Sequence, residues 1–341
     1  MLNDRRIRIL EALITEYITT AEPIGSRTIA KKYDLGVSSA TVRNEMSDLY
    51  DLGLIIQPHA SSGRIPSDKG YRLYVDSFMR RGELMPEQED FLRQTIESNI
   101  SHIGYLMRET AKAIAALTNY TAVAAKTSAN RDKIKHIQLL PFDEKNALMV
   151  LITEGKSVKN LAVPVPRQAD LQTLSAELNG AFSGAALEGG ALADRAALLA
   201  SRGACPPETL SAVVKVMGES SADEVYVYTS GVNNILAFPE FSNIERAKEI
   251  FNALEDKQFL LSLMTKGHGG GDLQIFIGEE NDDAPMRNCS VIRGDFKAAG
   301  SFVGSIGIIG PTRMDYSQAT AVLSSIVRRI NTLIGAFSGD G

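Results

Sequence analysis

The chain has 341 residues, of which 44% are hydrophobic, so it is long and apolar enough for roughly two or three domains with sizeable cores. Its formal net charge of -5 excludes a uniformly basic protein that coats nucleic acid. Two cysteines, Cys205 and Cys289, lie far apart, which argues against a disulfide scaffold and fits a reducing cytoplasm. We also expect neither a secretory signal nor a membrane-spanning segment, because no suitable uninterrupted apolar run is present.

The N-terminal residues predict a helix and then a helix–turn–helix. Apolar residues recur on one side of residues 3–19, and Asn3 or Asp4 can cap the start of this helix. A short helical pattern follows over residues 26–33, where Ser26 can supply a capping hydroxyl and Ile29 is the buried residue. Residues 34–36, Asp-Leu-Gly, then predict a turn.

The next helical pattern begins at Ser38 or Ser39, either of which can cap it. Apolar residues recur at i, i+4 and i+7, which predicts one buried stripe made of Val42, Met46 and Leu49. The other face is small or polar and consists of Ala40, Thr41, Arg43, Asn44 and Ser47. Arginine can grip guanine with two hydrogen bonds, asparagine can do the same to adenine, and a small methyl can contact thymine. This face is suited to reading bases; the alternative is an ordinary amphipathic helix with a solvated polar face.

A hairpin signal follows this helix. Residues 54–56 read as a short strand, residues 58–63 as a polar turn and residues 64–66 as the returning strand. Arg64 lies beside the tip, where it can meet a phosphate or enter the minor groove; the alternative is a surface salt bridge. Helix, turn, helix and hairpin in this order make a winged helix-turn-helix, which places its second helix in the major groove of DNA.

We predict that the DNA contacts come from both helices and the wing. The predicted residues are Ser26, Arg27, Ser38, Ser39, Ala40, Thr41, Arg43, Asn44, Ser47 and Arg64. Residues 1–80 hold 11 Lys and Arg against 10 Asp and Glu. DNA binding therefore depends on where the basic groups point and not on bulk charge.

The middle of the chain changes pattern twice. Ser67 can cap a helix to about residue 81, Gly82 and Pro86 mark a boundary, and one long helix is predicted over residues 86–117 as a candidate bridge between domains. Alternation then predicts four strands in an antiparallel meander, over residues 120–126, 134–140, 147–152 and 158–165, with turns at 143–146 and 153–156.

Residues 168–217 are helical again and rich in Ala and Leu, which indicates an insertion between two strand regions. A stripe of large apolar residues runs through Leu171, Leu174, Leu178 and Phe182, and a second helix is suggested by Leu187, Leu192, Leu198 and Leu199. Such helices suit contact between domains or subunits; the alternative is that they pack on their own sheet.

The last third predicts an α+β arrangement. The expected strands cover residues 225–229, 273–277, 289–293 and 302–309, with a helix over 243–254 and a terminal helix to about 337. Arg313 follows a strand-to-helix break, where it can bridge to the DNA-binding domain, pair with an acidic residue or hold the terminal helix by a salt bridge.

Nothing in the residue pattern predicts catalysis. Glu279 and Glu280 are neighbours that would not converge on one face of a strand, so with Asp282 and Asp283 they predict a solvated acidic loop. The Gly-rich segment 266–271 lacks the spacing of a phosphate-binding loop. The four histidines are scattered, and His59 is interpreted as a solvated loop residue. We therefore predict no enzyme activity, no catalytic residue, no cofactor and no metal.

A set of motifs spread along the chain points to one family: 38–46 (Ser-Ser-Ala-Thr-Val-Arg-Asn-Glu-Met), 52–55, 59–66, 70–72, 234–236, 239–241, 277–281 (Ile-Gly-Glu-Glu-Asn) and 310–316 (Gly-Pro-Thr-Arg-Met-Asp-Tyr). In these motifs the whole chain resembles the bacterial heat-inducible transcription repressor HrcA. The front motifs would allow other winged-helix regulators, whereas the later motifs in this order are specific. The Gly-rich segment 266–271 is not a mark of the family.

The resemblance implies a negative regulator of heat-shock transcription in the bacterial cytoplasm. It implies a homodimer that binds an inverted-repeat operator, a GAF-like domain with an inserted dimerisation domain, and dependence on the GroE chaperonin. We accordingly expect an α+β multidomain protein: residues 1–81 as the winged helix-turn-helix, 86–165 and 225–341 as the GAF-like α+β domain, and 166–224 as the helix-rich insertion. The alternative is a winged-helix regulator controlled by a small-molecule effector in the GAF-like domain.

Overall fold

The structure is a computed structural model of the chain that describes residues 2–60, 62–80, 82–99, 103–126, 133–154, 158–187, 190–221, 226–266, 273–298 and 301–338. Two compact units are present. One combines Met1–Lys126 with Tyr226–Gly341. We call its N-terminal part, through the helix that ends at Ser77, the winged helix, and the rest the body. The other, Thr127–Val225, is the inserted unit and is described by itself.

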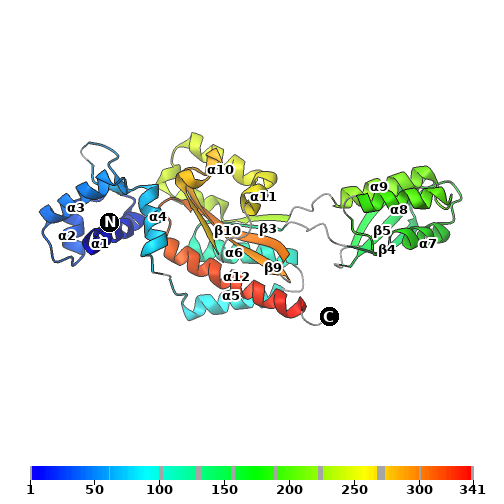
Figure 1. Cartoon of the computed structure of the whole chain (residues 1–341), viewed down its shortest axis with the longest axis horizontal. Coiled ribbons are helices and arrows are strands. Elements are labelled where there is room, and N and C mark those ends of the chain that lie inside the picture. Colours follow the sequence, from blue (N-terminus) through cyan, green and yellow to red (C-terminus); the bar gives the residue numbers. More distant parts are fainter. Residues whose placement is uncertain are drawn as a thin grey trace. The chain divides into compact units, whose positions relative to one another are not determined.

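The winged helix has the predicted order of elements (Figure 1). Its elements are α1 (Asp4–Thr20), α2 (Ser26–Lys32), α3 (Ser39–Asp51), β1 (Ile55–Ile56), β2 (Ile65–Pro66) and α4 (Asp68–Ser77). Asn3 caps α1 by accepting a hydrogen bond from the backbone of Arg6, as predicted. The predicted stripe of α3 is buried, and α1 packs against it to form the core of this domain.

The body begins with two helices, α5 (Pro86–Asn99) and α6 (Ile103–Thr118), so the single long helix predicted over residues 86–117 is wrong. The two helices pack against each other, which requires the chain to turn back between them. Both segments keep the same 3.6-residue periodicity, and periodicity within each segment carries no information on a reversal between them.

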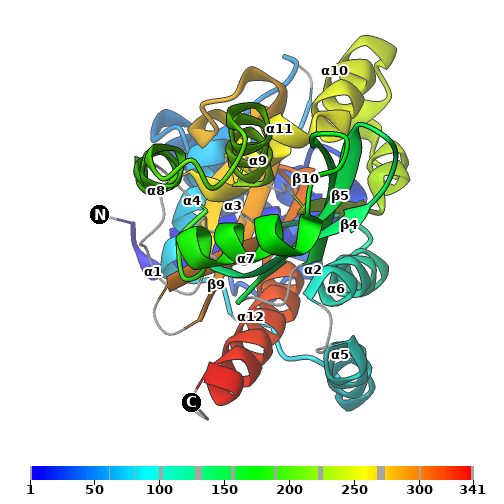
Figure 2. The same ribbon diagram turned by 90° about the vertical axis from the view of Figure 1, so that its right-hand side faces the viewer.

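A five-stranded antiparallel sheet forms the centre of the body, in the order β7-β3-β10-β9-β8. The strands are β3 (Thr121–Lys126), β7 (Tyr226–Ser230), β8 (Gln274–Ile277), β9 (Cys289–Ala298) and β10 (Ser301–Pro311). Helices α6 and α12 (Tyr316–Ser338) cover one face, and α10 (Ile244–Glu255) and α11 (Lys257–Thr265) cover the other (Figures 1 and 2). This arrangement is the α+β one that the sequence predicted, although α11 was not predicted.

The predicted four-stranded meander is only partly correct. Strand β3 belongs to the body, where it pairs with β7 and β10. The following three strands form a separate antiparallel sheet, so the predicted placement of residues 134–165 in the sheet of the body is wrong. Alternation of apolar residues shows which face of a strand is buried and not which strand lies beside it.

The inserted unit contains a three-stranded sheet and three helices. They are β4 (Ile134–Pro141), β5 (Asn146–Thr153), β6 (Val158–Pro164), α7 (Leu171–Phe182), α8 (Gly190–Ser201) and α9 (Pro207–Ser221). The predicted stripe of α7 packs on this sheet through Leu174, Leu178 and Phe182, which is the alternative that the sequence left open. In the second predicted helix, Leu198 is 56% exposed and so lies outside the core.

Other predictions near loops have mixed outcomes. The turn at residues 143–146 is confirmed, because the Asp143 carboxylate accepts hydrogen bonds from the backbone of Lys145 and Asn146. The turn at 153–156 and the Gly-rich segment 266–271 lie largely outside the described residues. No helix in the described part of the chain combines the length and apolar character needed to cross a membrane.

We predict that Leu178→Ala unfolds the inserted unit at lower denaturant, because removing a fully buried leucine costs about 2–5 kcal/mol. Each unit carries one buried cysteine, Cys205 in the inserted unit and Cys289 in the body. Burial raises the pKa of both thiols, that of Cys289 to about 12, so neither reacts readily while folded.

Thiol labelling followed by peptide mass spectrometry measures each unit separately. The variant should label Cys205 earlier and Cys289 at the same denaturant concentration as the wild type. Equal shifts at both cysteines would show that the two units unfold together.

Candidate nucleic-acid interface

The exposed face of α3 carries the residues that were predicted to read bases. Ala40, Arg43, Asn44 and Ser47 are exposed, opposite the buried stripe of the same helix. Arg43 and Asn44 make no hydrogen bond or ion pair with any residue that the structure describes. Both side chains therefore keep their full hydrogen-bonding capacity for a ligand.

Two of the acidic residues of α3, Glu45 and Asp48, face α1 instead. The Arg6 guanidinium donates a hydrogen bond of 2.8 Å to Glu45 and also pairs with Asp48. The hydrogen bond to Glu45 is the main cause that raises the pKa of Arg6. Together with the ion pair of Arg5 and Glu45, this pairing offsets the charge of the two carboxylates, which would otherwise repel a polyanion near the exposed face.

Two of the predicted contact residues form the cap of α3. Ser38 is the N-cap, and its hydroxyl accepts a hydrogen bond of 3.2 Å from the backbone of Thr41. The two hydroxyls also lie 3.0 Å apart. Ser39 is half-buried in the first turn. These residues therefore fix where α3 begins, which orients Arg43 and Asn44 one turn later.

The predicted capping role of Ser26 is wrong. Gly25 is the N-cap of α2, and Ser26 is the first helical residue and makes no capping hydrogen bond. A serine close to a helix start looks the same in sequence whether it lies just outside or just inside the helix, and only the backbone dihedrals separate the two positions. Ser26 is half-buried and Arg27 is exposed.

Arg64 is held beside α3 by a contact that the sequence did not predict. Its backbone pairs with Ile24 through hydrogen bonds of 2.8 and 2.9 Å, which adds a third short segment to the wing. Its guanidinium lies 5.2 Å from the ring centre of Tyr50, a distance at which a cation is attracted to an aromatic face. Within the described residues it has no carboxylate partner, so the expected alternative of a salt bridge is not found.

Tyr50 is thus a candidate residue that the sequence analysis missed. Its ring is 47% exposed although it is large and aromatic. It follows Arg43 by seven residues and Ser47 by three, so all three lie on one face of α3. That spacing was the available signal.

Two of the residues considered for catalysis are the neighbouring carboxylates Glu279 and Glu280. Glu279 and Glu280 lie in a short helix, η3 (Gly278–Glu280), and not on a strand. The predicted solvated acidic loop is wrong for Glu280, because its carboxylate pairs with Arg72 of α4. Arg313 pairs with Glu240 and also donates to the carbonyl of Ile18 in α1, so it does bridge to the winged helix. Among the described side chains, no three His, Cys, Asp or Glu residues come together as a metal site requires.

Three helices, a wing and an unpaired polar face on the second helix of the helix–turn–helix define a winged-helix DNA-binding protein. Residues 1–76 match the family model for the winged helix-turn-helix transcription repressor, HrcA DNA-binding, and residues 105–320 match the HrcA protein C terminal domain. The chain belongs to the HrcA family of heat-inducible transcription repressors. It is therefore a transcription repressor that binds DNA, and not an enzyme.

The relatives match along nearly the whole chain. The heat-inducible transcription repressor HrcA of Pelotomaculum thermopropionicum is 36% identical over 338 residues, which cover 98% of this chain and 97% of that protein. The heat-inducible transcription repressor HrcA of Clostridioides difficile is 38% identical, and the match covers 97% of this chain and 99% of that protein. A crystal structure described as that of a hypothetical protein has a TM-score of 0.64 at 23% identity. The match covers 98% of this chain and 99% of that one, so the two share the fold.

We predict that Ser38→Ala lowers the free energy of unfolding by about 1 kcal/mol, because it removes the cap of α3. Ser26→Ala is the matched control, since Ser26 makes no capping hydrogen bond, and should change stability by less than about 0.5 kcal/mol. Denaturant unfolding without DNA, followed by circular dichroism, measures both. A larger loss for Ser26→Ala would contradict this assignment of the two caps.

Proposed function

We propose that the chain represses chaperone operons by binding an inverted-repeat operator as a homodimer, and that chaperonin keeps it active. The observation that carries the DNA-binding part is the exposed face of α3, on which Arg43 and Asn44 are unpaired among the described residues. A winged helix places such a face in the major groove. The site of action would be the bacterial cytoplasm, on the operator DNA.

The proposed contacts divide by chemistry. Arg43 and Asn44 would read base edges, with Ala40 and Ser47 beside them against methyl groups and polar base atoms. Positioning contacts to the sugar-phosphate backbone would come from Ser26, Arg27, Ser38, Ser39, Thr41 and Arg64. Stacking on Tyr50 would hold the Arg64 guanidinium near the end of α3, where the backbone of the duplex or the minor groove would pass.

The proposed dimer needs a self-complementary surface, and we infer that this surface is the outward face of the inserted sheet. Ala147, Met149 and Leu151 of β5 are buried beneath the helices, so Leu148, Val150 and Ile152 alternate with them and point to the opposite face. Beside them, Leu140 is 42% and Val158 is 59% exposed. These five residues, and not the Ala- and Leu-rich helices, are our candidate surface, because the helices already pack on their own sheet.

Dependence on chaperonin is supported by the topology. Strand β3 pairs with β7 and β10, which follow it in sequence only after the whole inserted unit. Sheets built from such distant segments form slowly and expose apolar surface while they form. A chain that folds this way gains most from a chaperonin, and it loses that help when heat occupies the chaperonin with other clients.

A gel-shift experiment on inverted-repeat DNA tests the proposal. The full chain would be heated briefly and then assayed with and without chaperonin and ATP, with the dimer measured by sedimentation. We expect binding to fall on heating and to be restored only by chaperonin with ATP. Binding that survives heating, or that a small metabolite restores instead, would favour the effector alternative.

Arg43→Ala should weaken operator binding by about 1–3 kcal/mol per half-site and relax the preference at one base position, because the bidentate contact is lost. Arg43→Lys is the informative comparison, since it keeps the charge and removes the planar fork. Binding measured against operators substituted at each position reports both effects. An unchanged base preference in both variants would remove Arg43 from base reading.

Arg64→Ala should weaken binding to all sequences about equally and lower the slope of log affinity against log salt by about 0.9. Tyr50→Ala should give a smaller loss of the same kind, because it frees the guanidinium, whereas Tyr50→Phe keeps the ring and should bind like the wild type. Salt titrations of the three variants are the measurement. A change confined to base preference would instead make Arg64 a reader of base or groove shape.

A further inference from the structure

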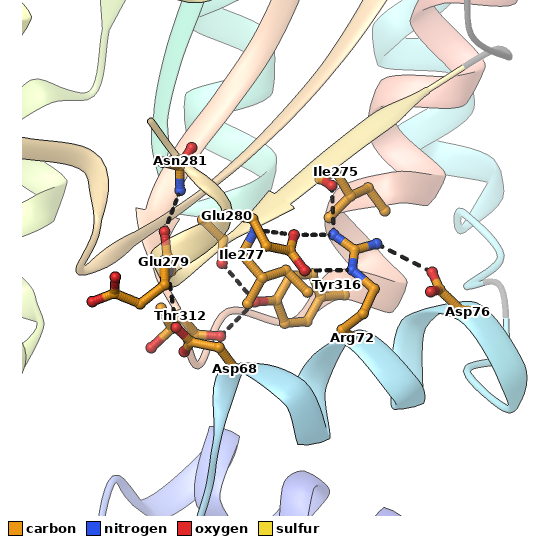
Figure 3. A network of polar contacts seen from close by, with 12 residues as sticks. Asp68, Arg72, Asp76, Ile275, Ile277, Glu279, Glu280, Asn281, Thr312 and Tyr316 are labelled. Carbon is orange, nitrogen blue, oxygen red and sulfur yellow. Dashed lines mark hydrogen bonds and ion pairs between the residues drawn. The ribbon is translucent and has the colours of Figure 1, made fainter. Parts of the chain in front are cut away.

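A second set of contacts joins the winged helix to the body, well away in sequence from the α3 face. Nε of Arg72 in α4 donates a hydrogen bond of 2.8 Å to Glu280, and Nη2 of Arg72 donates another to the second oxygen of that carboxylate (Figure 3). The same nitrogen donates 2.6 Å to the carbonyl of Ile275 in the body. A bidentate pair of this kind fixes direction as well as distance, because the guanidinium and the carboxylate are both planar.

Asp68, the first residue of α4, makes the next contact. Its carboxylate accepts a hydrogen bond of 3.0 Å from the backbone of Glu279 (Figure 3). Burial raises the pKa of Asp68, and the hydrogen bond from Glu279 opposes this shift. Gly278 makes the approach possible, because it has φ +53 and a Cβ there would lie 1.9 Å from the Asp68 carboxylate.

Beneath these polar groups the two parts share one apolar core. Tyr71 of α4 and Tyr316 of α12 are 1% and 0% exposed, and their ring centres lie 5.7 Å apart. Tyr316 is fixed by its hydroxyl, which lies 2.6 Å from Ser290 and donates over 2.6 Å to the carbonyl of Thr312. The contact is therefore a packed interface and not only a surface ion pair.

A third contact holds the other end of the winged helix. Arg313, whose side chain is 10% exposed, donates 2.9 Å to the carbonyl of Ile18 in the last turn of α1. A cation there satisfies a free carbonyl and matches the negative end of the helix dipole. Glu240 of the body pairs with the same guanidinium. The body thus contacts both α4 and α1, and α1 in turn packs against α3.

We propose that Asp68, Arg72, Glu280 and Arg313 form an interdomain clamp whose function is to position the winged helix for a two-half-site operator. This inference rests on the proposed function, since it requires a dimer on an inverted repeat. In a dimer whose first subunit is bound, a winged helix held at a fixed angle presents α3 to the second half-site at high effective concentration. A winged helix that moves freely relative to the body loses that advantage, although it keeps every contact to DNA.

A purely structural role predicts a different result. If the clamp only stabilised the fold, its loss would reduce binding to every DNA by the same factor. If the clamp sets the position of the winged helix, its loss leaves the affinity for one half-site unchanged. The gain in affinity from the second half-site then becomes smaller. The ratio of the affinities for two-half-site and one-half-site DNA separates the two roles.

The test uses the full chain and the duplex that the wild-type protein itself selects from a random pool. Glu280→Ala removes the body side of the Arg72 pair, and Gly278→Ala displaces Asp68 without changing any charge. Asp282→Ala is the matched control, because it removes a carboxylate from the same loop, where the side chain is 88% exposed and lies 4.0 Å from Lys266 of the body. Sedimentation and Cys289 labelling establish that each variant is dimeric and folded.

We expect Glu280→Ala and Gly278→Ala to lower the affinity ratio about tenfold while one-half-site binding stays within about twofold of the wild type. Both variants should also discriminate less against operators whose half-sites are moved by about 5 base pairs, half a turn of the duplex. Asp282→Ala should behave like the wild type. An unchanged ratio, or an equal loss on both probes, would overturn the clamp; failure of the wild type to select an inverted repeat would instead overturn the proposed function.

Discussion

The antiparallel pairing of β3 with β10 on one side and β7 on the other is the constraint on which the body depends. Ala122 and Ala124 face the core under α6 and α12, whereas Val123 and Ala125 face the core under α10 and α11. Every one of these side chains is buried, so β3 is the centre of both layers. Small residues at these positions let helices approach the sheet closely from both sides.

The same pairing makes room for the inserted unit. The chain leaves the body at the end of β3 and returns at the start of β7, the adjacent strand, so the insertion costs the sheet no hydrogen bonds. Its own core, centred on Leu178, Phe182 and Met149, lets it fold around a separate sheet. The proposed dimer surface on the insertion would therefore leave the pairing of the strands in the body unchanged.

In the winged helix, charge is sorted by position and not by amount. Glu45 and Asp48 of α3 turn toward α1 and pair with basic residues there. Arg43 and Asn44 remain exposed on the other face. A chain with a net charge of -5 can bind a polyanion because the local field at the contact face, and not the sum over the chain, acts on the DNA. In the proposed clamp, the carboxylate of Glu280 is likewise paired, with Arg72, so it orients the winged helix and does not repel DNA.

The sequence by itself determined most of the features whose cause lies within a turn or two of the chain, although the cap of α2 at Gly25 and the helix α11 were not among them. The Ser38 and Ser67 caps, the stripe of Val42, Met46 and Leu49, and the hairpin of the wing were all predictable, because caps, periodicity and turns are local. Only the tertiary structure decided that β3 and β4 belong to different sheets, that residues 86–117 fold back, that Tyr50 supports Arg64, and that Arg72 meets Glu280 across 208 positions. Those outcomes depend on which distant segments become neighbours, and a single sequence carries no local signal for the choice between partners of equal pattern.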